Sequence, residues 1–247
     1  MNKTYDFSGT CLSVDPPPYA FPPYQYRDNQ MLMLRLEVAE DYLRALVPEP
    51  MIVNEDNTLV VYIGWLHVIE PKVVSYGEAG IMIPVSLGER RGTYLPVLYL
   101  DEVELLTSGR ELWGFPKFRG DVSFNRDDSS VSASVSDGGT NIIEMNMDFR
   151  RAVEPSPAYD REHFLLKSIP AVSGDGFDVR QINTCRVRND HRKAIWEGEA
   201  DLHLRSTNAN PLGDIPIKNI VSSVYSVGDI LLDHGEVIYD YLETDTR

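Results

Sequence analysis

The sequence predicts a mainly β (α+β) fold: one domain of mostly antiparallel sheet that forms a closed or nearly closed barrel. Two observations favour this class. Segments rich in Val, Ile, Tyr and Trp recur along the chain between turn residues. Strands and helices do not alternate, and no glycine-rich phosphate loop is present. A doubly wound nucleotide-binding fold is therefore not expected.

The elements of the first half are mainly strands with two short helices. Residues 38–47 have the spacing of an amphipathic helix, which Pro48 ends. Asp101 can cap a second short helix that ends at Gly109. Strands are expected at residues 29–37, 58–70, 80–86 and 94–100, where branched and aromatic side chains gather.

The second half contains the clearest hairpin signal. Val131 and Val135 alternate with serines before a turn at residues 137–139, and residues 142–149 form the returning strand. Beyond it we expect alternating strands at 179–205 around a turn at 189–191, a helix at 217–225 and a last strand at 236–242.

The chain divides at a proline cluster. Residues 1–23 end in five prolines, at positions 16, 17, 18, 22 and 23, which favour an extended N-terminal arm. Such an arm either lies along a neighbouring subunit or remains a loose tail. Residues 24–247 contain no visible linker or repeat, so we expect a single β domain there.

Charge and composition exclude several function classes. Lys plus Arg is 23 and Asp plus Glu is 38, so the net charge is 23 − 38 = −15. This charge argues against nucleic acid and anionic membranes as partners. No apolar run reaches the length of a membrane span or resembles a signal peptide, so a soluble, cytoplasmic protein is expected. Cys11 and Cys185 form no redox or zinc pattern, and scattered histidines predict no metal site.

One lysine stands among apolar side chains. Lys117 follows Phe115 and Pro116 and precedes Phe118. Burial disfavours an ammonium ion, so a lysine in this setting can act as a neutral amine that attacks a carbonyl and forms a Schiff base. The alternative from the local pattern alone is a lysine at a strand edge whose ammonium group reaches water.

Four segments, in order, are distinctive: LVPEP (46–50), YGEAGIMIPV (76–85), GRELWGFPK (109–117) and residues 211–242. Together they resemble the acetoacetate decarboxylase family, and the resemblance extends from about residue 22 to residue 242. It implies a cone-like barrel that holds the active site, a homo-oligomer, and no cofactor beyond the covalent lysine adduct. It also implies that Lys117 is the Schiff-base lysine and Glu78 the active-site carboxylate, with Arg110 and Glu111 as a structural pair.

Three positions depart from the family's pattern. Phe118 stands where the family has a second lysine, Asn29 where we align an arginine, and Ile63 where we align a glutamate. Arg27 is two residues from Asn29, hence on the same face of a regular strand, and could supply the cation instead. Of the cues for lysine activation, only desolvation by neighbours such as Phe115 and Phe118 remains visible.

The position of Ile63 decides what else lines the predicted pocket. If Ile63 points inward, strand alternation directs Trp65 and His67 inward as well. These residues then join Phe115 and Phe118 as an apolar substrate-binding wall. For His67 two interpretations stay open, a core histidine bonded to a backbone carbonyl or a proton shuttle at the iminium and enamine stages.

The sequence therefore predicts a Schiff-base-forming lyase that acts on a small-molecule keto acid or ketone through an iminium and enamine on Lys117. Loss of polar groups around the substrate favours aldolase, dehydratase or cyclase chemistry, or a keto substrate larger than acetoacetate. A β-keto acid decarboxylase and a non-catalytic small-molecule-binding barrel are the alternatives, and a scaffolding role is a third.

Overall fold

The computed structural model describes residues 19–155, 159–208 and 210–244. The N-terminal arm predicted for residues 1–23 lies outside these residues except for its last five, and Cys11 lies outside them too. Within the described chain, no helix has the length and apolar character needed to span a bilayer.

The described residues are mostly in β-strands, which confirms the predicted fold class. The strands are β1 (Tyr24–Val38), β2 (Ile52–Val53), β3 (Thr58–Glu70), β4 (Val74–Leu87), β5 (Arg90–Leu100), β6 (Lys117–Arg119), β7 (Asp121–Arg126), β8 (Ser130–Asp137), β9 (Thr140–Val153), β10 (Tyr159–Pro170), β11 (Phe177–Leu204) and β12 (Ile217–Asp240). The helices are α1 (Glu40–Leu46), α2 (Val103–Ser108), a π-helical turn (Gly109–Trp113), a 3-10 turn (Leu212–Asp214) and α3 (Tyr241–Thr244).

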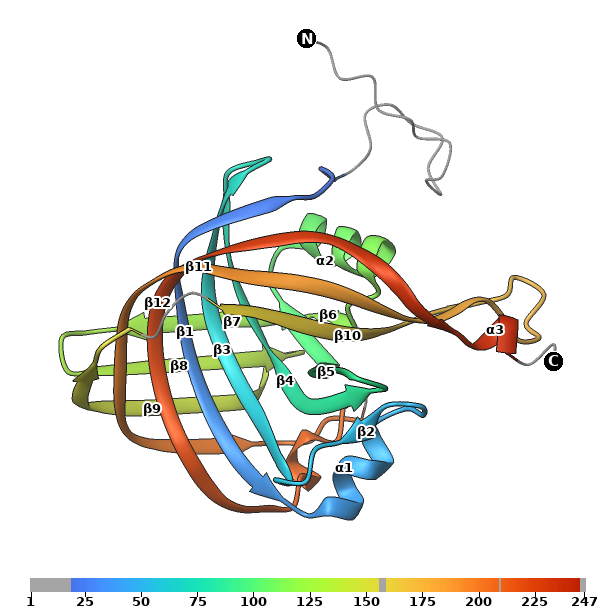
Figure 1. Ribbon diagram of the computed structural model, residues 1–247. Helices are drawn as coiled ribbons and strands as arrows, with labels where there is room; N and C mark the ends of the chain where they lie inside the picture. Colours follow the sequence, from blue (N-terminus) through green and yellow to red (C-terminus); the bar gives the residue numbers. More distant parts are fainter. Residues whose placement is uncertain (1–18, 156–158, 209, 245–247) are drawn as a thin grey trace, which may run out of the picture.

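These strands form one mixed sheet in the order β10-β5-β4-β3-β1-β12-β11-β9-β8-β7 (Figure 1). Neighbours on this path are antiparallel except β5 and β10, and β6 adds a parallel pairing to β5. β10 also pairs with β11, so it contacts both ends of the run from β5 to β11. The β5–β10 ladder has only two residue pairs, His163 with Thr93 and Phe164 with Tyr94. A closed barrel therefore stays a prediction.

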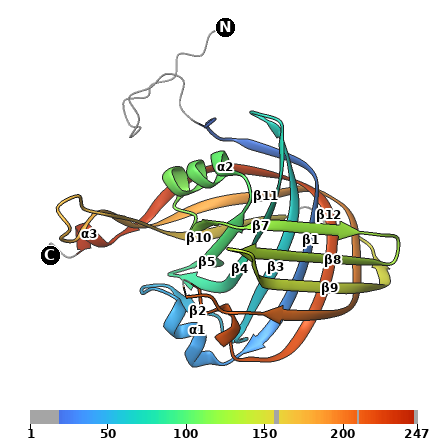
Figure 2. The ribbon, with the colours of Figure 1, turned by 180° about the vertical axis from the view of Figure 1, so that it is seen from behind.

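β3 separates two apolar cores. β7, β8 and β9 cross behind β1 and β3 (Figures 1 and 2), and β3 contacts both β7 and β8. The core between these layers contains Leu32, Ile63 and Val135. The other core, on the opposite face of β3, contains Tyr62 and Leu66, and the turn after α2 packs into it.

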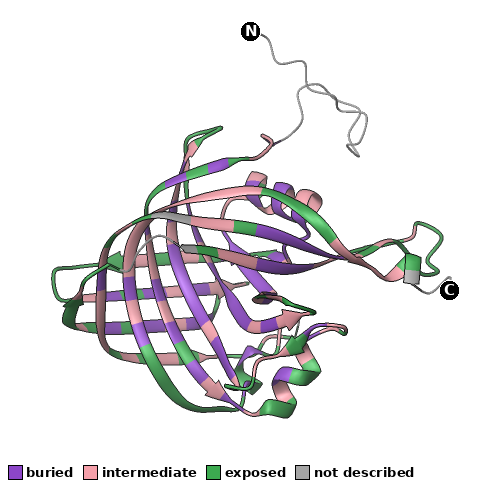
Figure 3. Ribbon diagram, in the orientation of Figure 1, coloured by how far each residue is buried: buried purple, intermediate pink, exposed green. Residues whose placement is uncertain are grey.

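β10, β11 and β12 continue beyond the body of the molecule towards α3 (Figure 1). Much of this extension is exposed (Figure 3). Its exposed apolar side chains include Ile169, Val172, Phe177, Val237 and Leu242. The homo-oligomer stays a prediction.

Most predicted elements are confirmed, including the helix at α1, the hairpin of β8 and β9, and the strand at residues 58–70. Two are wrong. Residues 217–225 are the start of β12, because this segment pairs with β1 on one side and, from Val224, with β11 on the other. No turn interrupts β11 at 189–191; the strand continues with a register shift against β12 between Arg188 and His191.

Candidate active site

The segment after β5 delivers Lys117 to the second core. α2 continues into the π-helical turn, and Gly114 then adopts a left-handed conformation with φ of 87°. This brings the chain back beside β5, where Lys117 pairs with Leu98. Gly109 leaves room for the returning side chain, since a Cβ there would lie 2.7–2.9 Å from Cδ, Cε and Nζ of Lys117.

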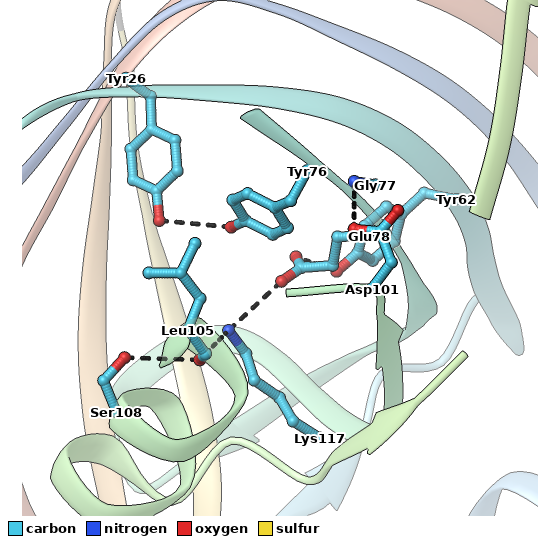
Figure 4. A network of polar contacts seen from close by, with 9 residues as sticks. All are labelled: Tyr26, Tyr62, Tyr76, Gly77, Glu78, Asp101, Leu105, Ser108 and Lys117. Atoms are coloured by element: carbon cyan, nitrogen blue, oxygen red, sulfur yellow. Dashed lines mark hydrogen bonds and ion pairs between the residues drawn. The ribbon is translucent and has the colours of Figure 1, made fainter. Parts of the chain in front are cut away.

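Lys117 is buried, with only 7% of the residue exposed. Its Nζ donates a hydrogen bond to the Leu105 carbonyl at 3.2 Å and lies 3.4 Å from Oε2 of Glu78 (Figure 4). The Phe115 ring centroid is 5.2 Å from Nζ. Arg110 holds the backbone of Lys117 by donating to its carbonyl oxygen at 3.0 Å. The amine is thus positioned by its own turn and faces the carboxylate of Glu78.

Buried tyrosines surround that carboxylate. Tyr62 donates its hydroxyl proton to Oε1 of Glu78 at 2.9 Å, and the Tyr26 and Tyr76 hydroxyls lie 3.4 Å apart (Figure 4). Burial raises the pKa of Tyr62 well above its usual value, and the charge of Glu78 raises it further. Tyr62 therefore stays protonated and acts as a hydrogen-bond donor to Glu78.

Lys117 and Glu78 open into a cavity of about 140 Å³. Its wall comes from strands far apart in the sequence, because β1, β3, β4, β10, β11 and β12 all contribute to it. Burial lowers the pKa of His163 to about 3, with a smaller contribution from Arg161, so this histidine is neutral near pH 7. The polar side chains of the lining outside the Lys117–Glu78 pair are Tyr26, Asn29, Tyr62, Tyr76, Arg161, His163, Arg192 and Ser226.

Four of the residues predicted for the site meet in this cavity: Lys117, Glu78, Asn29 and Phe115. The side chains of Lys117 and Glu78 are 8% and 14% exposed, so the pair is largely shielded from water. The roles assigned to these residues stay predictions.

The placement of Ile63, Trp65 and His67 in the pocket is wrong. In the β3–β4 ladder Tyr62 lies opposite Gly80 and Gly64 opposite Glu78, so the even-numbered residues of β3 share the face of Glu78. Ile63 has no exposed surface and belongs to the core that contains Leu32 and Val135, on the opposite face of β3. Trp65 and His67 line a separate concavity on that side.

His67 matches neither interpretation offered for it. Its ring Nδ1 lies 2.8 Å from Ser75 Oγ, so its partner is a hydroxyl and not a backbone carbonyl. Its backbone N–H donates to Oδ1 of Asn29 at 3.0 Å. The side chain is half-buried on the face away from Lys117.

Phe118 and Arg27 also lie outside the cavity. Phe118 follows Lys117 on β6, so strand alternation turns it outward, where it is 45% exposed and packs on Tyr99. Arg27 is exposed. The β1–β12 register shifts between Tyr26 and Asn29, which breaks the alternation assumed for Arg27.

The flanking motif residues also have other partners than those expected. Glu111 accepts a hydrogen bond from the Tyr19 hydroxyl at 2.6 Å, while Arg110 contacts the Lys117 backbone. Asp101 does not cap α2; Glu102 does so, and Asp101 accepts the Gly77 N–H at 2.9 Å instead (Figure 4).

Sequence reasoning missed Tyr62, Arg161, His163 and Arg192. Tyr62 was excluded by the wrong choice of face on β3. The other three lie on β10 and β11, and no local motif connects them to Lys117. Among the described residues, no three His, Cys, Asp or Glu side chains gather in a group that could hold a metal ion.

Comparison with known proteins identifies the family of this chain. The family model described as acetoacetate decarboxylase (ADC) matches residues 13–242. "Acetoacetate decarboxylase 1" of Mesorhizobium japonicum is 30% identical over 233 residues, 92% of either chain. An acetoacetate decarboxylase of Burkholderia multivorans is 30% identical over 236 residues, 94% of either chain.

Solved structures show the same fold. A structure of acetoacetate decarboxylase superposes with a TM-score of 0.82 at 27% identity, covering 94% of this chain and 97% of that one. The enduracididine biosynthesis enzyme MppR complexed with pyruvate superposes with a TM-score of 0.79 at 16% identity, covering 92% of this chain and 94% of that one. The second likeness shows the fold alone.

Proposed function

This chain belongs to the acetoacetate decarboxylase family, and from that premise we propose that it is a lyase in which Lys117 forms a Schiff base with a small keto acid. The observation that supports this most is the 3.4 Å separation of Lys117 Nζ and Glu78 Oε2 inside a cavity. An adjacent general base is one of the ways in which a nucleophilic side chain is activated.

The chemistry begins with the amine. Glu78 accepts a proton from the Lys117 ammonium, and the free amine attacks the carbonyl carbon of the substrate. A C–N bond forms, one amine proton and the proton held by Glu78 pass to the carbonyl oxygen, and that oxygen leaves as water, which gives a protonated imine and returns Glu78 to its carboxylate form. The positive nitrogen then withdraws electrons from the adjacent carbon and makes the α-C–H or α-C–COO⁻ bond easier to break.

Glu78 acts again at the next stage. Its carboxylate can take the α-proton of the iminium, which leaves an enamine, and the same group can later return a proton. Tyr62 orients Glu78 through the 2.9 Å hydrogen bond to Oε1, so that Oε2 faces the amine. General acid–base groups placed in this way typically contribute about 10²–10⁴-fold to a rate.

Within this chemistry we favour the aldolase, dehydratase or cyclase branch. Asn29, a neutral amide, lines the cavity where the family was aligned with an arginine, whereas Ile63 and Phe118 face elsewhere and say nothing about the cavity. In this branch the enamine attacks an aldehyde, and the resulting iminium can lose water. A cavity of about 140 Å³ is close to the roughly 150 Å³ that holds benzene. This size favours a small keto acid over a larger keto substrate.

The second candidate is a β-keto acid decarboxylase. It is favoured by the 30% identity to proteins named acetoacetate decarboxylase over nearly the whole chain. The two candidates share Lys117 and differ in which bond breaks next to the iminium. Carbon dioxide release from acetoacetate separates them: fast release supports the decarboxylase, and slow release with condensation of pyruvate and an aldehyde supports the aldolase branch.

Borohydride reduction tests the shared step. Pyruvate or acetoacetate with borohydride should add mass to the peptide that contains Lys117, and Lys117→Arg should remove the addition. Labelling of Lys72 or Lys167 instead would contradict the assignment. Absence of any adduct would favour the non-catalytic binding barrel.

A further inference from the structure

A second concavity lies on the face of β3 that is turned away from Lys117. Its volume of about 610 Å³ is in the range of small-molecule sites and well above the roughly 150 Å³ that holds benzene. Side chains from β1, β3, β7, β11 and β12 line it. Much of this wall is aromatic, and the chemistry proposed for Lys117 uses none of the rings, which belong to Trp65, Phe124, Trp196 and Tyr225.

The aromatic rings of this concavity leave surface for a ligand. Trp65, Phe124 and Trp196 are each only half-buried, although they line the same hollow. The Trp196 ring packs against Tyr225 and Phe149, with centroid distances of 5.5 and 5.6 Å, so its neighbours hold it in place. Apolar and aromatic walls of this kind are typical of ligand sites, and the flat faces of the rings favour a planar partner.

Arg126 adds a cation to this aromatic wall. Its guanidinium lies 5.7 Å from the ring centroid of Trp196 and 5.8 Å from that of Phe149, and the residue is exposed. In the part of the chain that the structure describes, no carboxylate lies within ion-pair distance of Arg126. A guanidinium that lies over aromatic rings keeps the N–H groups at its edge for an acceptor.

The other polar groups of the lining also favour a ligand that carries acceptors. The acid of the lining, Asp28, shares Lys193 with Asp229, and both carboxylates lie 2.6 Å from the ammonium group. Gln30 accepts the Tyr225 hydroxyl on its Oε1 at 2.7 Å, while its Nε2 has no hydrogen-bond partner among the described residues. The concavity thus offers an amide and a guanidinium as donors, and the guanidinium disfavours a second cation on the rings.

We propose that this concavity is a second binding site, which takes a small aromatic carboxylate. The ring of the ligand packs against Trp65 and Trp196, and its carboxylate accepts hydrogen bonds from Arg126. A neutral ring loses the charge-assisted contact, and an aliphatic acid loses the aromatic wall, so the site selects ligands that have both parts. The proposal does not depend on Schiff-base chemistry, because β3 separates the concavity from Lys117.

Tryptophan signals can locate the ligand. The chain has 3 tryptophans, so labelling with 5-fluorotryptophan gives one fluorine NMR signal for each, and Trp65→Phe and Trp196→Phe assign them. Trp113 is the internal reference for the Lys117 side, since its ring lies 6.0 Å from that of Phe115. We expect 2-naphthoate to shift the signals of Trp65 and Trp196 and to leave that of Trp113 unchanged. A shift of Trp113 alone, or no shift at millimolar 2-naphthoate, would overturn the proposal.

Affinities test the contact between the carboxylate and Arg126. By calorimetry, 2-naphthoate should bind about 10-fold more tightly than 2-naphthamide, which keeps the ring and lacks the charge. Arg126→Gln should remove this difference, whereas Arg44→Gln, an exposed arginine of α1 that does not line the concavity, should keep it. Equal affinities for acid and amide in wild type, or equal losses in the two arginine variants, would overturn the contact. Binding of a methyl glycoside without binding of 2-naphthoate, detected by the same tryptophan signals, would assign the concavity to a sugar and overturn the aromatic acid.

Discussion

The two faces of β3 differ in chemistry, although their residues alternate along one strand. Tyr62 and Leu66 face the cavity of Lys117, and Tyr62 binds Glu78. Ile63 and Trp65 face the opposite way, towards β7, β8 and β9. Because side chains alternate with a period of two, a shift of one residue exchanges one set for the other. β3 thus contributes one face to the cavity of Lys117 and the other face to the concavity lined by Trp65 and His67.

The second face is aromatic. Trp65 and His67 line a concavity together with Phe124, Trp196 and Tyr225. The Trp196 ring stacks on Phe149 at 5.6 Å between centroids and lies 5.5 Å from Tyr225. No lysine is among the described residues that line this concavity, whereas Lys117 lines the cavity on the first face of β3. The following substitutions test this division.

Glu78→Gln should have the largest effect on the cavity side. The amide keeps the shape but cannot take protons, so turnover should fall by roughly 10²–10⁴-fold. The exposed Glu199→Gln is a matched control of the same chemistry. Steady-state kinetics on the substrate identified by trapping would measure the loss. A kcat near that of wild type would show that Glu78 has only a structural role.

Gly109→Ala should displace the nucleophile without removing it. The new Cβ would lie within 3 Å of three Lys117 side-chain atoms, so the amine must move. A displacement of about 1 Å can cost roughly 10²-fold in rate. Rates of borohydride trapping in wild type and variant would measure this, provided that the two proteins have the same Tm. A wild-type rate would mean that Lys117 tolerates another position and that its placement is not critical.

Tyr62→Phe should have a smaller effect. It removes the hydrogen bond that orients Glu78 and leaves the carboxylate in place, so we expect about a 10-fold loss of kcat. Tyr76→Phe is the control, since the Tyr76 hydroxyl faces Tyr26 instead of Glu78. Equal losses in the two variants would argue against a specific role for Tyr62.

Trp65→Ala and His67→Ala should have the smallest effect on chemistry. Both residues lie on the far face of β3, so imine formation should stay within about 2-fold of wild type, although removal of the Trp65 ring should lower Tm. Trapping rates and thermal unfolding of the same samples would test this. A 10-fold slower trapping in a well-folded His67→Ala protein would connect the two faces and contradict their separation.

Much of the fold could be predicted because its signals are local. The hairpin at β8 and β9 has a turn at Gly138 and Gly139, both with positive φ, and β3 has a long β-branched run. The helix predicted at residues 217–225 failed because apolar residues three and four apart in a short segment fit a helix as well as a strand. Pairing with β1 and β11 decides in favour of the strand.

The site residues also divide into those that a local signal predicts and those that only long-range packing brings together. Lys117 and Glu78 stand in recognisable motifs, and they meet in the structure. The inward direction of Ile63 depended on one alignment with the family, and because side chains alternate along a strand, the wrong face for Ile63 also placed Trp65 and His67 on the wrong side. Arg161 and Arg192 could not be found, since only the packing of β10 and β11 against β5 and β12 brings them to Lys117.

Lys167 is the strongest rival to Lys117 as the reactive amine. Burial lowers the pKa of Lys167, which favours its neutral form. However, its Nζ donates to the Glu111 carbonyl at 2.6 Å, and it lines concavities other than the one that contains Glu78. Geometry therefore favours Lys117 as the reactive amine, and an experiment can distinguish the roles of the two lysines.

Exchange of the methyl protons of pyruvate in D₂O, followed by proton NMR, tests the central claim most directly, because it reports iminium and enamine formation without any second substrate. We predict exchange with wild type and with Lys167→Arg, and none above the buffer rate with Lys117→Arg. Exchange that persists in Lys117→Arg and disappears in Lys167→Arg would contradict the assignment of Lys117 as the Schiff-base lysine.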